Sequence, residues 1–143
     1  MSSLSAFLKK NKKVKPNTTF VATKSLCDAD GKPLEWEIKA VTTKEAEAIR
    51  EECMFEVPVK GKPNQFRHKL DTKSYMAKLA VKGIVFPDLY DAELQDSYGV
   101  RTPEDLIMEM VDNPTEYGAL IAFIQEYSEL TDGLDGKIAK AKN

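Results

Sequence analysis

Apolar and polar residues alternate one by one over residues 34–40, which is typical of a strand with one buried face. Trp36 is the largest side chain on the apolar face. The preceding segment 18–27 is rich in β-branched and apolar residues. The loop 28–33 between the two segments is dense in Asp, Gly and Pro. The pattern predicts a β-hairpin over residues 18–41, with Trp36 in the core.

A helical pattern follows at residues 43–54. Thr42 and Glu45 have the spacing of a capping box at its start. The apolar face of this helix holds Ala46, Ile49 and Cys53. Residues 55–59 and 65–70 are interpreted as two short strands or an extended excursion.

Apolar residues cover almost the whole circumference of a helix predicted at 72–86, which is typical of a buried helix. Pro87 ends this helix. A short helix is predicted at 91–98. Two more helices begin at Thr102 and Asn113, where a capping residue is followed by proline and then by acidic residues.

These patterns predict an α+β protein, with an N-terminal β-hairpin or small antiparallel sheet packed on helices and a mostly helical C-terminal half. Residues 1–17 are expected to form an N-terminal arm, and residues 132–143 a flexible tail. The single domain between them, residues 18–131, is predicted to contain the sheet over 18–70 and to be helical over 71–131.

The predicted arm carries an apolar stripe, because Leu4, Phe7 and Leu8 have the spacing of one helix face. Five lysines follow between residues 9 and 15. A helix this short cannot bury its stripe by itself, so we expect the arm to dock on its own domain or on a neighbouring molecule. Three apolar side chains offer little area for insertion, which argues against binding to a membrane.

The net charge of −2 hides a strong local separation of charge. Residues 1–87 carry a net +7, residues 88–136 a net −12 and residues 137–143 a net +3. Either these are solvated faces, or the acidic part contacts a basic partner or the basic part of another subunit. Duplex nucleic acid is a poor partner for the acidic part, which would repel phosphates.

Composition is that of an ordinary globular protein, with 42% apolar and 31% charged residues. No apolar run is long enough for a membrane span, and no secretory signal is evident. Two cysteines, Cys27 and Cys53, do not make a disulfide scaffold or a zinc site. We therefore expect a cytoplasmic protein.

Few residues are suited to catalysis or metal binding. His68 is the single histidine, and the chain has no nucleophile elbow, phosphate-binding loop or dinucleotide fingerprint. Cys53 is interpreted as a small core residue. Residues 28–31 read Asp-Ala-Asp-Gly, but the spacing of a calcium loop is missing, so they are interpreted as a turn. We expect no catalytic residue, no cofactor and no metal site.

The candidate protein-binding residues fall in two groups. The first group is the apolar stripe of the arm, made of Leu4, Phe7 and Leu8. The second group is Leu89, Tyr90, Leu94 and Tyr98, near the predicted helix at 91–98. As exposed anchors, the second group would bind a partner. Alternatively, these side chains pack the short helix on the core.

One stretch, residues 86–100, resembles a signature of the XkdN-like family of phage tail assembly chaperones, which occur in phages and prophages of Gram-positive bacteria. Residues 3–11, 34–42, 57–62 and 141–143 are similar to the same family. The resemblance covers nearly the whole chain in order.

The resemblance implies a non-enzymatic role. Tail chaperones of this kind coat the tape measure protein, a long helical chain, before tail tube subunits polymerise around it, and they are absent from the mature virion. Such a helical chain would aggregate unprotected. The implied partners are therefore the tape measure protein and the tail tube protein, in the cytoplasm of the host cell. Self-association along the tape measure is also expected, and head-to-tail contacts that do not close would give a spiral.

The last three residues, Ala141-Lys142-Asn143, can be encoded by codons that contain the slippery heptamer A-AAA-AAC. Similar tail chaperones are made in a short form and a frameshifted long form. A longer form that contacts the tail tube protein is therefore a hypothesis, and the gene sequence tests it.

Two other functions are compatible with the sequence. A small tail-completion or head–tail joining adaptor would have a similar size but would stay in the virion. A helix-turn-helix regulator built from residues 91–130 is disfavoured by their acidic charge. An enzyme has no constellation of residues to support it.

Overall fold

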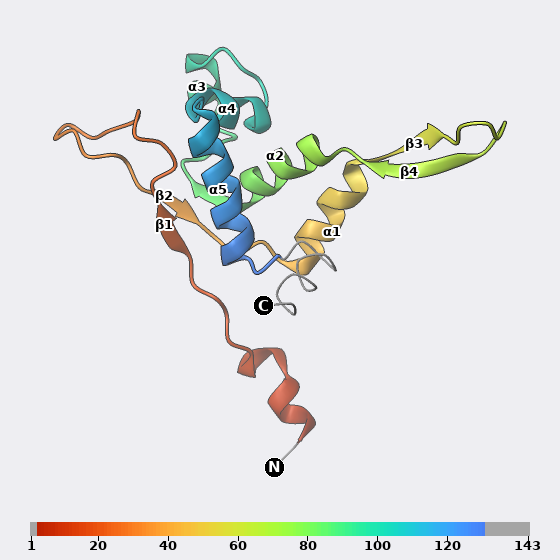
Figure 1. Ribbon diagram of the computed structural model, residues 1–143. Coiled ribbons are helices and arrows are strands. Elements are labelled where there is room, and N and C mark those ends of the chain that lie inside the picture. Colours follow the sequence, from red (N-terminus) through yellow and green to blue (C-terminus); the bar gives the residue numbers. More distant parts are fainter. Residues whose placement is uncertain (1–2, 131–143) are drawn as a thin grey trace, which may run out of the picture.

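The chain has an α+β fold in the computed structural model, which describes residues 3–130 (Figure 1). Its elements are, in chain order, the 3-10 turns η1 (Leu4–Phe7) and η2 (Lys9–Asn11), then β1 (Thr18–Phe20), β2 (Trp36–Ile38), α1 (Thr43–Glu52), β3 (Met54–Pro58), β4 (Phe66–Leu70), α2 (Thr72–Gly83), β5 (Ile84–Phe86), α3 (Ala92–Ser97), α4 (Pro103–Met110) and α5 (Pro114–Tyr127). The predicted fold class is confirmed. The predicted tail at 132–143 lies outside the described residues.

A three-stranded antiparallel sheet lies at the centre of the domain, with strand order β1-β2-β5. Phe20 pairs with Trp36, and Ile38 pairs with Ile84, so β2 is the middle strand. Helices α2 and α5 pack on each other, and α1 and α4 pack on α2. The predicted pairing of the first two strands is therefore confirmed.

The predicted length of the first strand is wrong. A strand was expected over 18–27, but β1 ends at Phe20, and pairing between the two segments resumes only at a single bridge between Cys27 and Pro33. The chain then turns into the body, where Ala22 and Thr23 are buried. The Thr23 hydroxyl donates a hydrogen bond to the Glu116 carboxylate (2.7 Å), and this bond to α5 draws the chain away from β2. Leu34, expected on the buried face, is instead exposed.

The predicted end of the central helix is also wrong. A helix was expected over 72–86, but α2 ends at Gly83 and residues 84–86 form β5. Ile84 and Val85 are β-branched and suit a strand, and Ile84 pairs with Ile38 of β2. Residues 84–86 therefore form hydrogen bonds to β2 in place of a further helical turn, and this third strand covers the open edge of β2.

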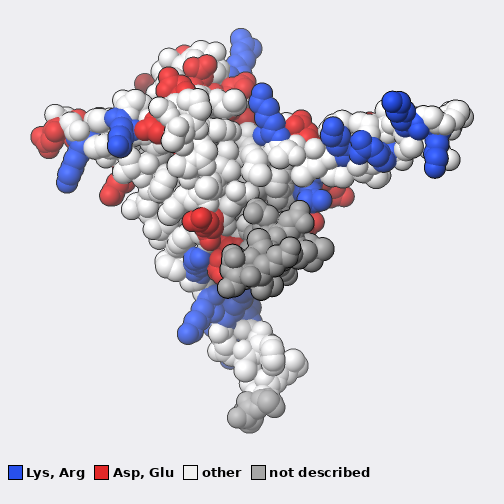
Figure 2. All heavy atoms as spheres, viewed as in Figure 1, with Lys and Arg blue, Asp and Glu red and all other residues white. Residues whose placement is uncertain are grey.

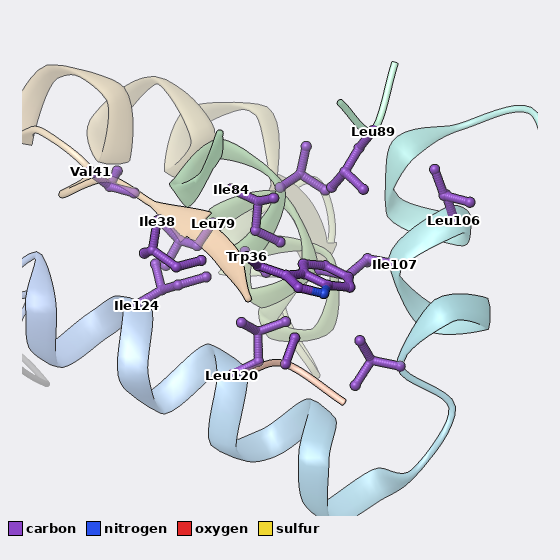
Figure 3. Close-up of a cluster of buried hydrophobic side chains, with 14 of the residues drawn as sticks. Trp36, Ile38, Val41, Leu79, Ile84, Leu89, Leu106, Ile107, Leu120 and Ile124 are labelled. Carbon is purple, nitrogen blue, oxygen red and sulfur yellow. The ribbon is translucent and has the colours of Figure 1, made fainter. Parts of the chain in front are cut away.

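The core forms where the sheet meets helices α2, α4 and α5. Figure 3 shows Trp36 of β2 between Ile84, Ile107 and Leu120. The largest fully buried side chains are Trp36, Ile38, Leu79, Leu106, Ile107, Leu120, Ile124, Val111 and Thr23. Residues from four sequence-distant segments therefore stabilise one core.

The predicted helix starts are confirmed. Thr42 and Glu45 form the reciprocal capping box of α1. The Thr102 hydroxyl accepts from the Asp105 N–H at the start of α4 (3.1 Å), and the Asn113 side chain caps α5 in the same way. Each cap satisfies backbone donors that the first helical turn leaves without partners.

Glu116 connects α5 to the loop after β1, and this contact predicts a dependence of stability on pH. Hydrogen bonds from the Thr23 hydroxyl and then from the Lys24 N–H lower the pKa of Glu116, and they outweigh desolvation. Because its pKa is lower in the folded state, the ionised carboxylate stabilises the fold fully above its unfolded pKa. That contribution is lost as pH falls through the folded pKa.

We expect Glu116→Gln to be less stable than the wild type at neutral pH, and the difference in free energy of unfolding to shrink on acidification to about pH 3. Urea unfolding followed by circular dichroism at several pH values measures that difference. Glu126→Gln, at an exposed position of the same helix, is the control. A difference that stays constant with pH would contradict the assigned role of Glu116.

Candidate functional site

The N-terminal arm extends away from the body of the molecule (Figure 1). Leu4 and Phe7 are 80% and 83% exposed, and Leu8 is also exposed. An amphipathic helix was predicted here, but the chain forms two 3-10 turns instead. An α-helix this short forms too few hydrogen bonds to offset the free-energy cost of its nucleation. The apolar stripe of the arm is therefore not buried on its own domain in this structure.

The base of the arm is anchored to the end of α5. The Lys15 ammonium lies 4.2 Å from the centre of the Tyr127 ring and 3.5 Å from the Glu129 carboxylate. The Tyr127 hydroxyl donates to the carbonyl of Pro16. These contacts fix where the arm leaves the domain.

The second predicted group of binding residues, near α3, contains both buried and exposed side chains. Leu89 is buried in the core, and its carbonyl accepts a hydrogen bond from the Gln95 side chain (2.8 Å). Leu94 and Tyr98 are half-buried and pack against the core. Tyr90 is 69% exposed. Leu89 is thus a core residue in this structure, and Tyr90 is the member of the group that is open to a partner.

The β3–β4 hairpin is a surface that the sequence did not identify as a binding site. It projects beyond α1 and α2 (Figure 1) as a separate two-stranded sheet. Phe55 pairs with Lys69, and Val57 pairs with Arg67, so these four side chains share one face. Phe55 is exposed and Val57 is partly exposed. The face combines an apolar strand with a basic one.

A groove between α2, α4 and α5 is a further surface that the sequence did not reveal. Its volume is about 840 Å³. Its apolar walls are formed by Met76, Ala77, Met108, Tyr117 and Ile121. Burial raises the pKa of the Tyr117 hydroxyl. Residues from three helices contribute to the groove, so no single stretch of sequence carries its pattern.

The groove is lined by charged residues of both signs, with Lys73 and Lys78 on α2 and Glu104 and Asp105 on α4. Lys78 is paired with Glu104 (3.1 Å) and Glu52 (3.7 Å), and the hydrogen bond with Glu104 raises the pKa of Lys78 above its usual value despite desolvation. Asp105 and Glu109 are exposed one turn apart on α4. Figure 2 shows acidic side chains gathered at the α3–α4 end and basic ones on the arm and the hairpin. The charge separation in the sequence is therefore a separation in space.

The residues considered for chemistry lie apart from one another. His68 is exposed on β4 opposite Glu56, while Cys53 is buried in the core, as predicted. The Asp28 carboxylate accepts from the N–H groups of Asp30 and Lys32, which confirms the turn. Within residues 3–130, no three His, Cys, Asp or Glu side chains are grouped to hold a metal.

None of the helices described at residues 3–130 has the length and apolar character needed to cross a membrane.

Comparison with known protein families identifies the relationship. The family described as phage XkdN-like tail assembly chaperone protein matches residues 4–142. The chain belongs to this family. The chaperone is similar to the uncharacterized protein YqbN of Bacillus subtilis strain 168, with 25% identity over 121 residues, 85% of this chain and 80% of YqbN. It is also similar to the phage-like element PBSX protein XkdN of that strain, with 22% identity and the same coverage.

The fold of the tail assembly chaperone is shared with a solved structure. The crystal structure of YqbN matches 90% of this chain and 98% of its own, with a TM-score of 0.73 and 19% identity. The resemblance seen in the sequence is confirmed, and the family implies a non-enzymatic role.

Proposed function

We propose that this chaperone binds and solubilises the tape measure protein and helps to recruit tail tube subunits during phage or prophage tail assembly. It acts in the cytoplasm of the bacterial host and leaves before the virion is mature. Its membership of a tail assembly chaperone family supports this role. The observation that carries the proposal is the projecting β3–β4 hairpin, on which the large apolar side chains of Phe55 and Phe66 are exposed.

The hairpin is suited to a partner because a two-stranded sheet is only marginally stable alone in water. Its Phe55–Val57 strand offers an apolar strip about two side chains long, beside Arg67 and Lys69. An amphipathic helix with an apolar stripe and acidic flanks fits this face. Covering each apolar side chain contributes about 1–2 kcal/mol. A long tape measure chain with many such stripes would contact many copies of the chaperone.

Recruitment of the tail tube protein is proposed to use a longer, frameshifted form. The gene sequence at the codons for residues 141–143, which lie outside the described structure, tests this part of the proposal. A slippery heptamer there with an overlapping downstream frame supports the longer form. Any other codon choice, or no overlapping frame, overturns it.

Co-expression with the tape measure protein from the same locus tests the main proposal. We expect the wild-type chaperone to move most of the tape measure protein into the soluble fraction. Phe55→Asp with Val57→Asp should reduce that fraction several-fold, because the change removes the apolar strip. Val21→Asp with Leu34→Asp is a matched control, since Leu34 is 42% exposed and Phe55 44%. The measurement is the tape measure protein in supernatant and pellet.

Two outcomes would contradict this proposal. A tape measure protein that stays insoluble with the wild-type chaperone removes the function. Full solubility with the hairpin variant removes the hairpin as the binding surface. Mass spectrometry of purified virions separates the alternative adaptor function, because an adaptor would be retained in the particle.

A further inference from the structure

We propose that the groove between α2, α4 and α5 binds the N-terminal arm of a second copy of this chain, and that this contact builds an open head-to-tail assembly. The inference goes beyond the proposed function, because it concerns self-association without the tape measure protein. It depends on the shapes, charges and positions of the arm and the groove.

The arm and the groove match in their apolar parts. The arm exposes Leu4, Phe7 and Leu8 to solvent, although such a set of side chains normally finds cover. The groove has a volume of about 840 Å³, which is within the range of pockets that enclose a ligand of some tens of atoms. Met76 and Met108 line it, and methionine adapts its shape to an incoming side chain.

The arm and the groove also match in charge. Lys9 and Lys10 directly follow the apolar residues of the arm, and both are exposed. Asp105 lines the groove on its α4 side, Glu109 is exposed one turn further along α4, and Lys73 and Lys78 line the opposite, α2 side. An arm with its apolar residues in the groove and its lysines toward α4 would bring Lys9 and Lys10 near these carboxylates. Opposite charges would then favour the contact and orient it.

The position of the arm favours a second copy over its own groove. Lys15 and Pro16 hold the base of the arm at the C-terminal end of α5. Residues 12–17 contain no turn that would reverse the chain. Figure 1 shows the arm leaving at the end of the molecule opposite α3 and α4. Two different surfaces at opposite ends form a heterologous contact, which continues as an open chain unless the rotation closes it.

Two variants of the full-length chain test the contact. Leu4→Asp with Phe7→Asp removes the apolar part of the arm, and Met108→Arg places a bulky cation in the groove. All three positions are exposed, so the fold should be retained. The matched controls are Ser5→Asp with Ala6→Asp in the same arm, and Val21→Arg at an exposed position outside the groove.

Sedimentation velocity over a range of concentrations is the measurement. We expect the mass of the wild type and the controls to rise with concentration. The two variants should stay monomeric, with association at least about tenfold weaker. An equimolar mixture of the two variants should form a dimer and nothing larger. In that dimer, the intact arm of the groove variant fills the intact groove of the arm variant.

Three outcomes would overturn the inference. A wild type that is monomeric at all concentrations indicates that the arm docks on its own groove or not at all. A mixture that stays monomeric shows that arm and groove do not meet. A groove variant that assembles like the wild type but no longer solubilises the tape measure protein would assign the groove to that protein. None of these outcomes depends on the hairpin, so the proposed function is tested separately.

Charge reversal provides a second test. Lys9→Glu with Lys10→Glu should weaken association of the full-length chain, and so should Asp105→Lys with Glu109→Lys. Mixing these two variants should restore both contacts, because the reversed arm meets the reversed α4 side chains and the native arm meets the native ones, so open chains of alternating copies should form. Failure to restore these contacts would contradict the predicted orientation of the arm.

Discussion

Trp36→Ala is expected to lower the free energy of unfolding by about 3–5 kcal/mol, because it removes a large side chain from a closed core. Trp36 is 1% exposed and belongs to the middle strand of the sheet. Its indole lies between Ile84, Ile107 and Leu120, which come from three different elements (Figure 3). Those elements cannot all move into the space that alanine would leave. The total free energy of unfolding of a domain of this kind is about 5–15 kcal/mol, so a large part of its stability would be lost.

Urea unfolding followed by far-ultraviolet circular dichroism measures this loss without depending on tryptophan fluorescence. Trp36→Phe is the conservative control, and it should cost clearly less because an aromatic ring still fills most of the space. Leu34→Ala lies on the same alternating segment but at an exposed position, so we expect a small effect. An unfolding midpoint of Trp36→Ala equal to that of Leu34→Ala would show that Trp36 is not central to the core.

Local sequence signals were sufficient to predict most helices and the class of the fold. Caps such as Thr102 and Asn113 are read from neighbouring residues, and the structure places a helix start at each. The alternation around Trp36 predicted a half-buried strand, and Trp36 and Ile38 are buried in it. These signals succeed because capping and amphipathicity depend on residues that are close in the chain.

The elements that were mispredicted depend on contacts between distant residues. The strand after Thr18 ends early because Thr23 hydrogen-bonds to Glu116, 93 positions away. Residues 84–86 leave the helical pattern because β2 offers them a pairing edge. Apolar residues that fill a helix circumference also suit a buried strand, so periodicity alone does not separate the two.

The candidate site was predicted only in part. The apolar stripe of the arm was identified from Leu4, Phe7 and Leu8, and the structure leaves these residues exposed. The status of Leu89 depends on how the loop before α3 packs, which the sequence left open. The groove combines side chains of three helices, and it required the packed structure to become visible.

The two proposals together describe a simple geometry of assembly. Contacts between arm and groove would repeat the same relation from copy to copy, and each copy would add one projecting hairpin. A row of hairpins would match a long partner with repeated apolar stripes. Each weak contact would then act at a high local concentration, so many of them could hold a chain that a single copy binds only weakly.

Gly83→Ala is expected to lower the free energy of unfolding by about 1–3 kcal/mol, as is typical of overpacking. A Cβ atom at this position would lie 2.7 Å from Cγ2 and 3.4 Å from Cδ1 of Ile124, which is fully buried. Gly118→Ala is the matched control, because a Cβ there meets nothing within 4 Å. In a helix, that change should be neutral or stabilise by up to about 1 kcal/mol.

A double-mutant cycle with Ile124→Ala separates the steric clash from other effects. Ile124→Ala alone should cost about 2–5 kcal/mol, because it opens a cavity. In that background the new methyl group has room, so Gly83→Ala should cost little or even stabilise. The coupling between the two positions should therefore be about 1–3 kcal/mol. If Gly83→Ala costs the same in both backgrounds, the close approach of α2 and α5 is not what requires glycine. If the cost disappears, this contact limits how closely the two helices pack beneath the sheet.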